Sequence, residues 1–164
     1  MTRHNYKFSP WRYWEIENEK LLPKLIADNT IERYMIKESL PFEDAFVQPD
    51  IIIRYETIHI NNKPREFYGI IDSKYYMNKQ WLQDDATNIF AQMGKYKIAL
   101  QNYMNPKSVS IETVISMPDS TCQKELRAIA RQRQISTLVT KDLPSTINHW
   151  KQRALEIEKQ YQID

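Results

Sequence analysis

Two apolar segments of this chain each carry acidic chemistry at the end of what looks like a buried strand. One reads Asp50 followed by three isoleucines, and the other ends in Asp72, Ser73 and Lys74. Residues two apart on a strand face the same way, so Asp72 and Lys74 should lie side by side, roughly 6–7 Å apart along the strand. Two carboxylates on neighbouring strands with a lysine beside them indicate a metal site with a cationic assistant, an arrangement able to hydrolyse a phosphodiester.

The bulk composition is that of a soluble globular protein, with 41% hydrophobic and 27% charged residues in 164. We therefore expect one domain, residues 1–164, in the cytoplasm, with no signal peptide and no membrane segment. The single cysteine, Cys122, excludes an internal disulfide framework and a cysteine-rich zinc site, and it favours a reducing compartment. Because the chain has only two glycines, glycine-rich phosphate loops are excluded. The net charge of +2 does not by itself indicate a nucleic-acid partner.

Hydrophobic periodicity predicts the order α-β-β-α-β-α-β-α, which indicates an α/β sandwich around a mixed central sheet flanked by helices. The strongest signal is an apolar stripe from Leu82 to Tyr103 at alternating spacings of four and three, with Asp84 and Asp85 placed in the first helical turn. The predicted helices span 15–27, 30–38, 82–103, 122–134 and 145–160, the last capped by Ser145. The predicted strands span 51–60, 65–76, 109–117 and 135–140.

The first two strands, 51–60 and 65–76, are separated by turn residues at 61–64. The simplest interpretation is an antiparallel hairpin. This hairpin would bring Asp50, at the start of one strand, close to Asp72 and Lys74 near the end of the other. The predicted connection at residues 41–44 precedes it. A second Pro-Asp pair, at Pro118 and Asp119, leads into a polar helix start and is interpreted as a cap.

The ordered set of Pro49-Asp50, a strand, Asp72-x-Lys74 and a helix resembles the PD-(D/E)xK nuclease superfamily. The stretch from Ile71 to Tyr75, followed by Asp84-Asp85, is similar to the nuclease domains of McrC-type restriction subunits. The Gln92-x-x-x-Tyr96 element is similar to RecB-type nuclease domains. The resemblance covers residues 49–118 and implies a restriction-endonuclease-like fold.

The resemblance also implies roles for individual residues. Asp50, Asp72 and the backbone carbonyl of Ser73 would bind Mg²⁺ or Mn²⁺, and Lys74 would orient or deprotonate the attacking water. Gln92 would brace the site. Many members add a glutamate from the first helix; Glu15, Glu17 and Glu19 compete for that position, and Glu19, nearest the helix centre, is favoured.

Nucleic-acid contacts are expected from Tyr96, Lys95, Arg127 and Arg131. For these residues, interpretations without a functional role also remain open. Tyr96 also belongs to the apolar stripe and is equally well explained as a core residue. The two arginines share one helix face, for which solvated surface is the default interpretation and phosphate contact the alternative.

The function that these features predict is a Mg²⁺-dependent DNA endonuclease, in restriction, defence or mobile-element processing. One alternative is an RNA endonuclease of the cap-snatching type. Another is a nucleic-acid-binding module that keeps the nuclease fold without cleaving. The expected partner is nucleic acid, DNA in preference to RNA. Because double-strand cleavage by a small domain calls for two active sites, a homodimer or a larger restriction complex is also expected.

Overall fold

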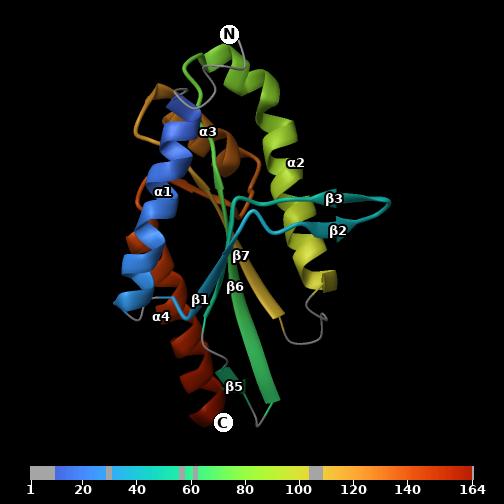
Figure 1. Ribbon diagram of the computed structural model, residues 1–164, viewed down its shortest axis with the longest axis vertical. Helices are drawn as coiled ribbons and strands as arrows, with labels where there is room; N and C mark the ends of the chain where they lie inside the picture. Colours follow the sequence, from blue (N-terminus) through green and yellow to red (C-terminus); the bar gives the residue numbers. More distant parts are fainter. Residues whose placement is uncertain (1–9, 29–30, 56–57, 61–62, 104–108, 164) are drawn as a thin grey trace.

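The computed structural model describes residues 10–28, 31–55, 58–60, 63–103 and 109–163. Its centre is a mixed sheet with the strand order β1-β4-β6-β7-β8, and helices cover both faces (Figure 1). The predicted α/β sandwich with a mixed central sheet is therefore confirmed. No helix in these described ranges combines the length and the apolar character required to cross a membrane.

The predicted pairing of the first two strands is confirmed. β4 (Ile51–Arg54) pairs antiparallel with β6 (Lys63–Ser73), and the short β5 (Ile58–Ile60) pairs with the beginning of β6. The predicted turn at 61–64 lies partly outside the described residues. β7 (Val109–Ser116) and β8 (Leu138–Thr140) extend the sheet in parallel, each reached through a helical crossover.

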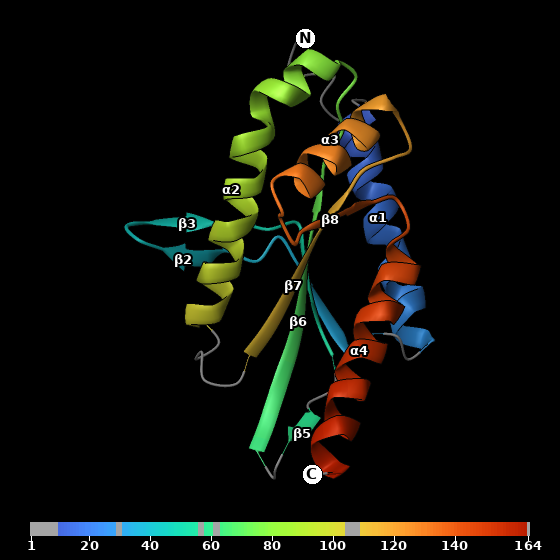
Figure 2. The same ribbon diagram turned by 180° about the vertical axis from the view of Figure 1, so that it is seen from behind.

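The segment between the first helix and β4 differs from the prediction. The prediction of a helix over residues 30–38 is wrong, because β1 (Arg33–Ile36) pairs antiparallel with β4 at the sheet edge. Residues 41–44 are more than a connection: β2 (Leu40–Phe42) and β3 (Ala45–Val47) form a separate antiparallel hairpin. Figures 1 and 2 show this hairpin projecting from the sheet across α2. Strand pairing with β4 outweighs the weak local helix signal.

One face of the sheet is covered by α1 (Pro10–Ala27) and α4 (Leu143–Ile163). Their buried apolar residues pack on alternate β-strand residues such as Ile51, Ile53 and Ile71. The closest approach is at Gly69, where an added Cβ would lie 2.4 Å from a ring carbon of Trp150. α1 continues through Pro23 to Ala27, as far as predicted.

The other face is covered by α2 (Lys79–Tyr103) and α3 (Thr121–Gln132), as seen in Figure 2. The predicted apolar stripe is buried from Leu82 to Leu100, but its last member, Tyr103, is exposed. Ile52 and Ile70, which alternate with the isoleucines of the opposite face, complete this core. The alternation explains why both segments are apolar on both sides: the sheet is central.

The helix starts also differ in detail. α2 begins at Lys79, where the Asn78 side chain accepts from the backbone N–H groups of residues 80 and 81, so Asp84 and Asp85 lie beyond the first turn. The cap of α3 is Ser120 rather than the predicted Pro118-Asp119 pair. α4 begins before the predicted cap, because the Asp142 carboxylate accepts from the Ser145 N–H at 3.1 Å.

Candidate active site

Asp50 and Asp72 lie side by side where β4 begins and β6 ends. The register pairs Ile51 with Ile71, which places the two aspartates at the same level of neighbouring strands. Asp50 is 6% exposed and Asp72 is 3% exposed. A carboxylate this deeply buried requires charged or hydrogen-bonding partners, so the partners of each group define what the site can do.

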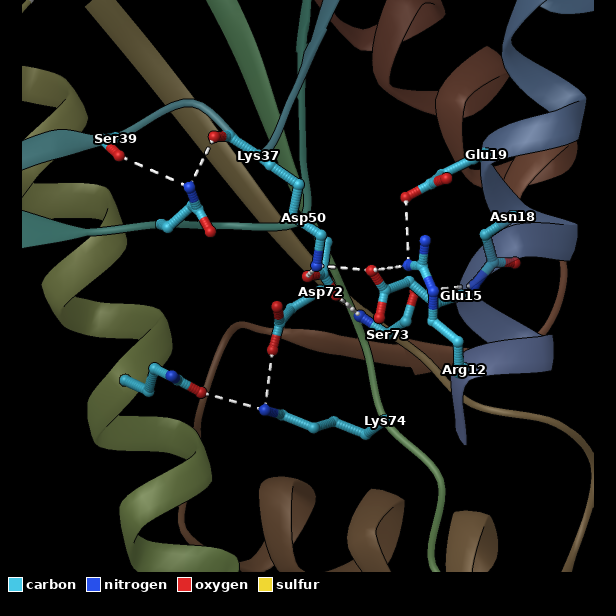
Figure 3. Close-up of polar contacts among 12 residues, drawn as sticks. Arg12, Glu15, Asn18, Glu19, Lys37, Ser39, Asp50, Asp72, Ser73 and Lys74 are labelled. Atoms are coloured by element: carbon cyan, nitrogen blue, oxygen red, sulfur yellow. Dashed lines mark hydrogen bonds and ion pairs between the residues drawn. The ribbon is translucent and has the colours of Figure 1, made fainter. Parts of the chain in front are cut away.

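Asp50 is held through both of its oxygens. Its Oδ2 accepts from the backbone N–H of Ser73 at 2.8 Å, which ties β4 to the end of β6. Its Oδ1 accepts from the Lys37 ammonium at 2.6 Å. Figure 3 shows Asp50 close to this lysine and to Ser73, with α1 at the right of the view. The Ser73 hydroxyl in turn accepts from the Asn18 side chain of α1 at 2.9 Å.

Asp72 contacts a different cation. The Lys74 ammonium lies 2.9 Å from Asp72 Oδ2, as expected for residues two apart on one strand face. The same ammonium donates to Gln92 Oε1 on α2 at 3.0 Å. Lys74 is therefore oriented from two sides, by the carboxylate and by an amide of a separate element (Figure 3).

A pocket of about 480 Å³ opens beside Lys74. It lies between α2 and the β2–β3 hairpin, and both Gln92 and Lys95 line it. Tyr76, which also lines it, donates its hydroxyl to Asp85 at 2.9 Å. Lys74 and Lys95 thus face a space able to admit a ligand from solvent.

Tyr96 is buried, at 4% exposure, among the apolar residues of α2. Burial raises its pKa, and the negative charges of Asp72 and Asp50 raise it further. The side chain therefore belongs to the core and is also within electrostatic reach of both aspartates. Direct contact of Tyr96 with nucleic acid stays a prediction.

The first helix contributes three polar residues on one face, Glu15, Asn18 and Glu19. Glu15 is 1% exposed, and its Oε1 contacts both Lys37, at 2.5 Å, and Arg12, at 2.6 Å. Glu19 is farther from Arg12, at 3.9 Å, and more exposed. Both glutamates therefore lie near Asp50, and Glu15 shares a cation with it, although Glu19 was the predicted choice.

Two acidic groups of the site, Asp72 and Glu19, have pKa values above those of ordinary carboxylates. Burial raises the pKa of Asp72 to about 7; the Lys74 ammonium lowers it and the Asp50 carboxylate raises it. Burial also raises the pKa of Glu19, which Arg12 partly counteracts. Such shifts are common where carboxylates converge on a ligand site, because a bound cation offsets the cost of desolvating them.

The donor set fits a divalent cation that prefers oxygen. Mg²⁺ is commonly bound by one or two carboxylates with waters completing the shell, and Asp50 and Asp72 provide such a pair. Glu15 Oε2 is buried without a hydrogen-bond partner and supplies a further oxygen nearby. Within the described ranges, no three acidic, histidine or cysteine side chains are arranged as a ready-made metal cluster.

Arg127 and Arg131 lie elsewhere, on α3. They line a different hollow of about 280 Å³ against β8. Arg127 donates to the Val139 carbonyl oxygen at 3.3 Å and to Gln123 Oε1 at 3.1 Å, so it anchors α3 to β8. The structure does not bring these arginines together with Lys74 and Lys95, and their contact with nucleic acid stays a prediction.

Sequence reasoning missed Lys37 as a member of this site. It follows β1, in a segment predicted to be helical, and no motif marks it. Asn18 was also missed, although its position three residues after Glu15 places it next to Glu15 on one helix face. That spacing was the available signal for the α1 contribution.

Comparisons with known proteins give limited information. No protein-family model matches the chain, and no curated protein matches it. Among solved structures, the chain is similar to the small subunit of the heterodimeric restriction endonuclease R.BspD6I. The TM-score is 0.45 at 12% sequence identity, over 90% of this chain and 77% of the other.

Proposed function

We propose that this chain is a metal-dependent endonuclease that hydrolyses phosphodiester bonds of DNA. The observation that carries the proposal is the pair of buried aspartates at the ends of adjacent strands, with Lys74 against one of them and an open pocket beside it. Two buried carboxylates, of which Asp72 has a raised pKa, have no evident benefit for the fold, but they suit a cation site.

The proposed ligands for Mg²⁺ or Mn²⁺ are Asp50, Asp72 and the Ser73 backbone carbonyl, with Glu15 or Glu19 from α1. A divalent cation there would neutralise charge on the phosphate and lower the pKa of a bound water. The Asp50–Ser73 hydrogen bond keeps two of these groups together. Asn18 fixes the Ser73 side chain, so the strand end is held from α1 as well.

Lys74 would orient the attacking water or offset negative charge on the phosphate oxygens. Its ammonium can do so because Asp72 and Gln92 hold it at the mouth of the pocket. Lys95 lines the same pocket and would contact a backbone phosphate. A strand of nucleic acid lying between α2 and the β2–β3 hairpin would therefore meet both lysines.

The decisive experiment is a cleavage assay on supercoiled plasmid, linear duplex, single-stranded DNA and RNA. Each substrate is incubated with Mg²⁺, Mn²⁺ or EDTA, with Asp72→Ala as the inactive comparison and Asp119→Ala as the matched control at an exposed aspartate. We expect metal-dependent DNA cleavage that is lost only in Asp72→Ala. Cleavage of RNA alone would instead identify an RNA endonuclease.

Binding of DNA without cleavage under any condition would identify a binding module and contradict the proposal. The plasmid arm also tests oligomerisation. Nicking alone fits one active site per encounter, whereas linearisation at the first detectable cut fits two sites acting together. The predicted homodimer or larger restriction complex would show as linearisation whose rate rises steeply with protein concentration.

A further inference from the structure

Lys37 occupies an unusual position between two buried carboxylates of different elements. Its ammonium lies 2.5 Å from Glu15 Oε1 on α1 and 2.6 Å from Asp50 Oδ1 at the start of β4. The Glu15 and Asp50 side chains are each almost fully buried, whereas Lys37 is about one-third exposed. One protein cation thus joins the first helix to the central sheet at the candidate metal site.

The backbone of Lys37 is fixed as firmly as its side chain. Its N–H donates to the Asp50 carbonyl oxygen at 2.9 Å, and its own carbonyl oxygen accepts from the Gln48 side chain at 2.8 Å. Its φ is 56°, in the left-handed region that residues other than glycine, asparagine and aspartate seldom adopt. A lysine side chain does nothing to favour that conformation, so the contacts around it must hold it there.

The ammonium contacts the same oxygens that a divalent cation would need. The Ser73 N–H donates to Asp50 Oδ2, and the Lys37 ammonium donates to the other oxygen of the same carboxylate, Oδ1. Glu15 Oε1 is likewise bound to Lys37, with Arg12 beside it. Because Lys37 and Arg12 already share Glu15 Oε1, a divalent cation added beside the Lys37 ammonium would be strongly repelled in this poorly solvated site.

The charged groups around Lys37 are of both signs. The Lys37 ammonium itself contacts the Asp50 and Glu15 carboxylates. Arg12 adds a second positive charge at Glu15, while Glu19 and Asp72 add negative charge close by. The metal-free site is therefore already balanced by protein cations.

We propose that Lys37 is a positioning residue that serves as an internal cation: it holds Glu15 and Asp50 together in the metal-free protein and must be displaced when a divalent cation binds. This inference rests on the proposed metal-dependent function. It implies that Lys37 lowers the affinity of the site for metal. It also implies that the Lys37 side chain, which is partly exposed, moves out towards solvent when the metal binds.

The test measures metal affinity rather than cleavage. Mn²⁺ and Mg²⁺ are titrated by calorimetry into the wild-type protein, Lys37→Met, Lys37→Arg and the control Lys20→Met, which removes an exposed α1 lysine paired with Glu17. We expect Lys37→Met to bind metal at least about fivefold more tightly, the lower end of usual couplings between linked sites. Lys37→Arg and Lys20→Met should show no gain in affinity.

A second readout uses the wild-type protein and does not depend on a variant that folds. The Lys37 ammonium, held by two carboxylates, should give a protected ¹H–¹⁵N signal by NMR in EDTA, assigned by its absence in Lys37→Arg. Saturation with Mg²⁺ should abolish or strongly shift this signal. Denaturant unfolding in EDTA should also show that Lys37→Met is less stable than Lys20→Met.

Two results would overturn the inference. One is that Lys37→Met binds metal with the same affinity as the wild-type protein but is less stable without metal. That result would make Lys37 a purely structural link. The other is an unchanged Lys37 signal at saturating Mg²⁺. Either result would leave the proposed endonuclease function standing. If neither the wild-type protein nor any variant binds Mg²⁺ or Mn²⁺, both the metal-dependent function and this inference are overturned.

Discussion

The ammonium of Lys74, the residue directly after β6, donates to Gln92 Oε1 on α2 at 3.0 Å. The two residues are 18 apart in sequence, and the bond crosses from the central sheet to the helix that covers it (Figure 3). The contact gives Gln92 a specific role, because its amide restricts the position of a lysine that also contacts Asp72.

Replacing Gln92 by alanine should lower the cleavage rate by about tenfold or more, because a misplaced catalytic group loses much of its effect. Metal affinity should change little, since Gln92 contacts Lys74 and neither aspartate. Single-turnover cleavage and calorimetry measure the two quantities. Gln101→Ala, at an exposed position on the same helix, is the matched control and should behave as wild type. Equal rates for the two variants would contradict the role of Gln92.

Asp72→Asn should have opposite effects on activity and on metal-free stability. Burial raises the folded-state pKa of Asp72 to about 7 from the ordinary aspartate value of 3.8, so between those values the folded protein binds more protons than the unfolded chain. The stability of the wild-type protein in EDTA should therefore fall as pH rises through that window. The asparagine variant should lack this loss at Asp72, be more stable at pH 8, and not cleave.

Urea unfolding in EDTA at pH 5 and pH 8 measures this effect, and the Asp119→Asn variant controls for an aspartate at the surface. A variant Asp72→Asn less stable than wild type at pH 8 would show that the Lys74 contact outweighs the cost of burial. Added Mg²⁺ should stabilise the wild-type protein and leave Asp72→Asn unchanged.

Lys95→Ala should weaken DNA binding and reduce its salt dependence. The lysine lines the pocket beside Lys74, and the loss of one phosphate contact should reduce the slope of log affinity against log salt by about one. Lys97→Ala removes an exposed lysine of α2 that does not line this pocket, and its slope should match that of the wild type. Fluorescence anisotropy at several salt concentrations checks both, and equal slopes for the two variants would remove Lys95 from the interface.

The two glycines of the chain offer a matched test of packing. Gly69→Ala should destabilise the fold by about 1–3 kcal/mol, because the new methyl group would meet the Trp150 ring and a side-chain carbon of Ile53. Gly94→Ala, in the middle of α2 with nothing within 4 Å of the added carbon, should stabilise it by up to about 1 kcal/mol. Denaturant unfolding measures both, and a neutral Gly69→Ala would show that α4 shifts easily.

Strand periodicity alone was enough to predict the central part of the site. Asp72 and Lys74 share a strand face because of a local rule, and the antiparallel pairing of β4 with β6 followed from two β-rich segments close in sequence. The α2 stripe placed Gln92 at its edge for the same reason, since helical spacing fixes which residues face the sheet.

The residues that surround Asp50 could not be located in this way. β1 is a short edge strand whose structure depends on pairing with β4, so its sequence read locally as a helix. The choice between Glu15 and Glu19 depended on which helix turn faces Asp50, and that is set by the packing of α1 on β6 rather than by either glutamate.

The sequence by itself determined the α/β class, the strands that carry Asp50 and Asp72, and the lysine beside them, because these follow from periodicity over a few residues. Only the tertiary structure decided that Lys37 lies between Glu15 and Asp50, and that Arg127 and Arg131 lie apart from Lys74. The physical reason is that burial and long-range pairing, which give charged groups their partners, are properties of the folded chain and not of any segment.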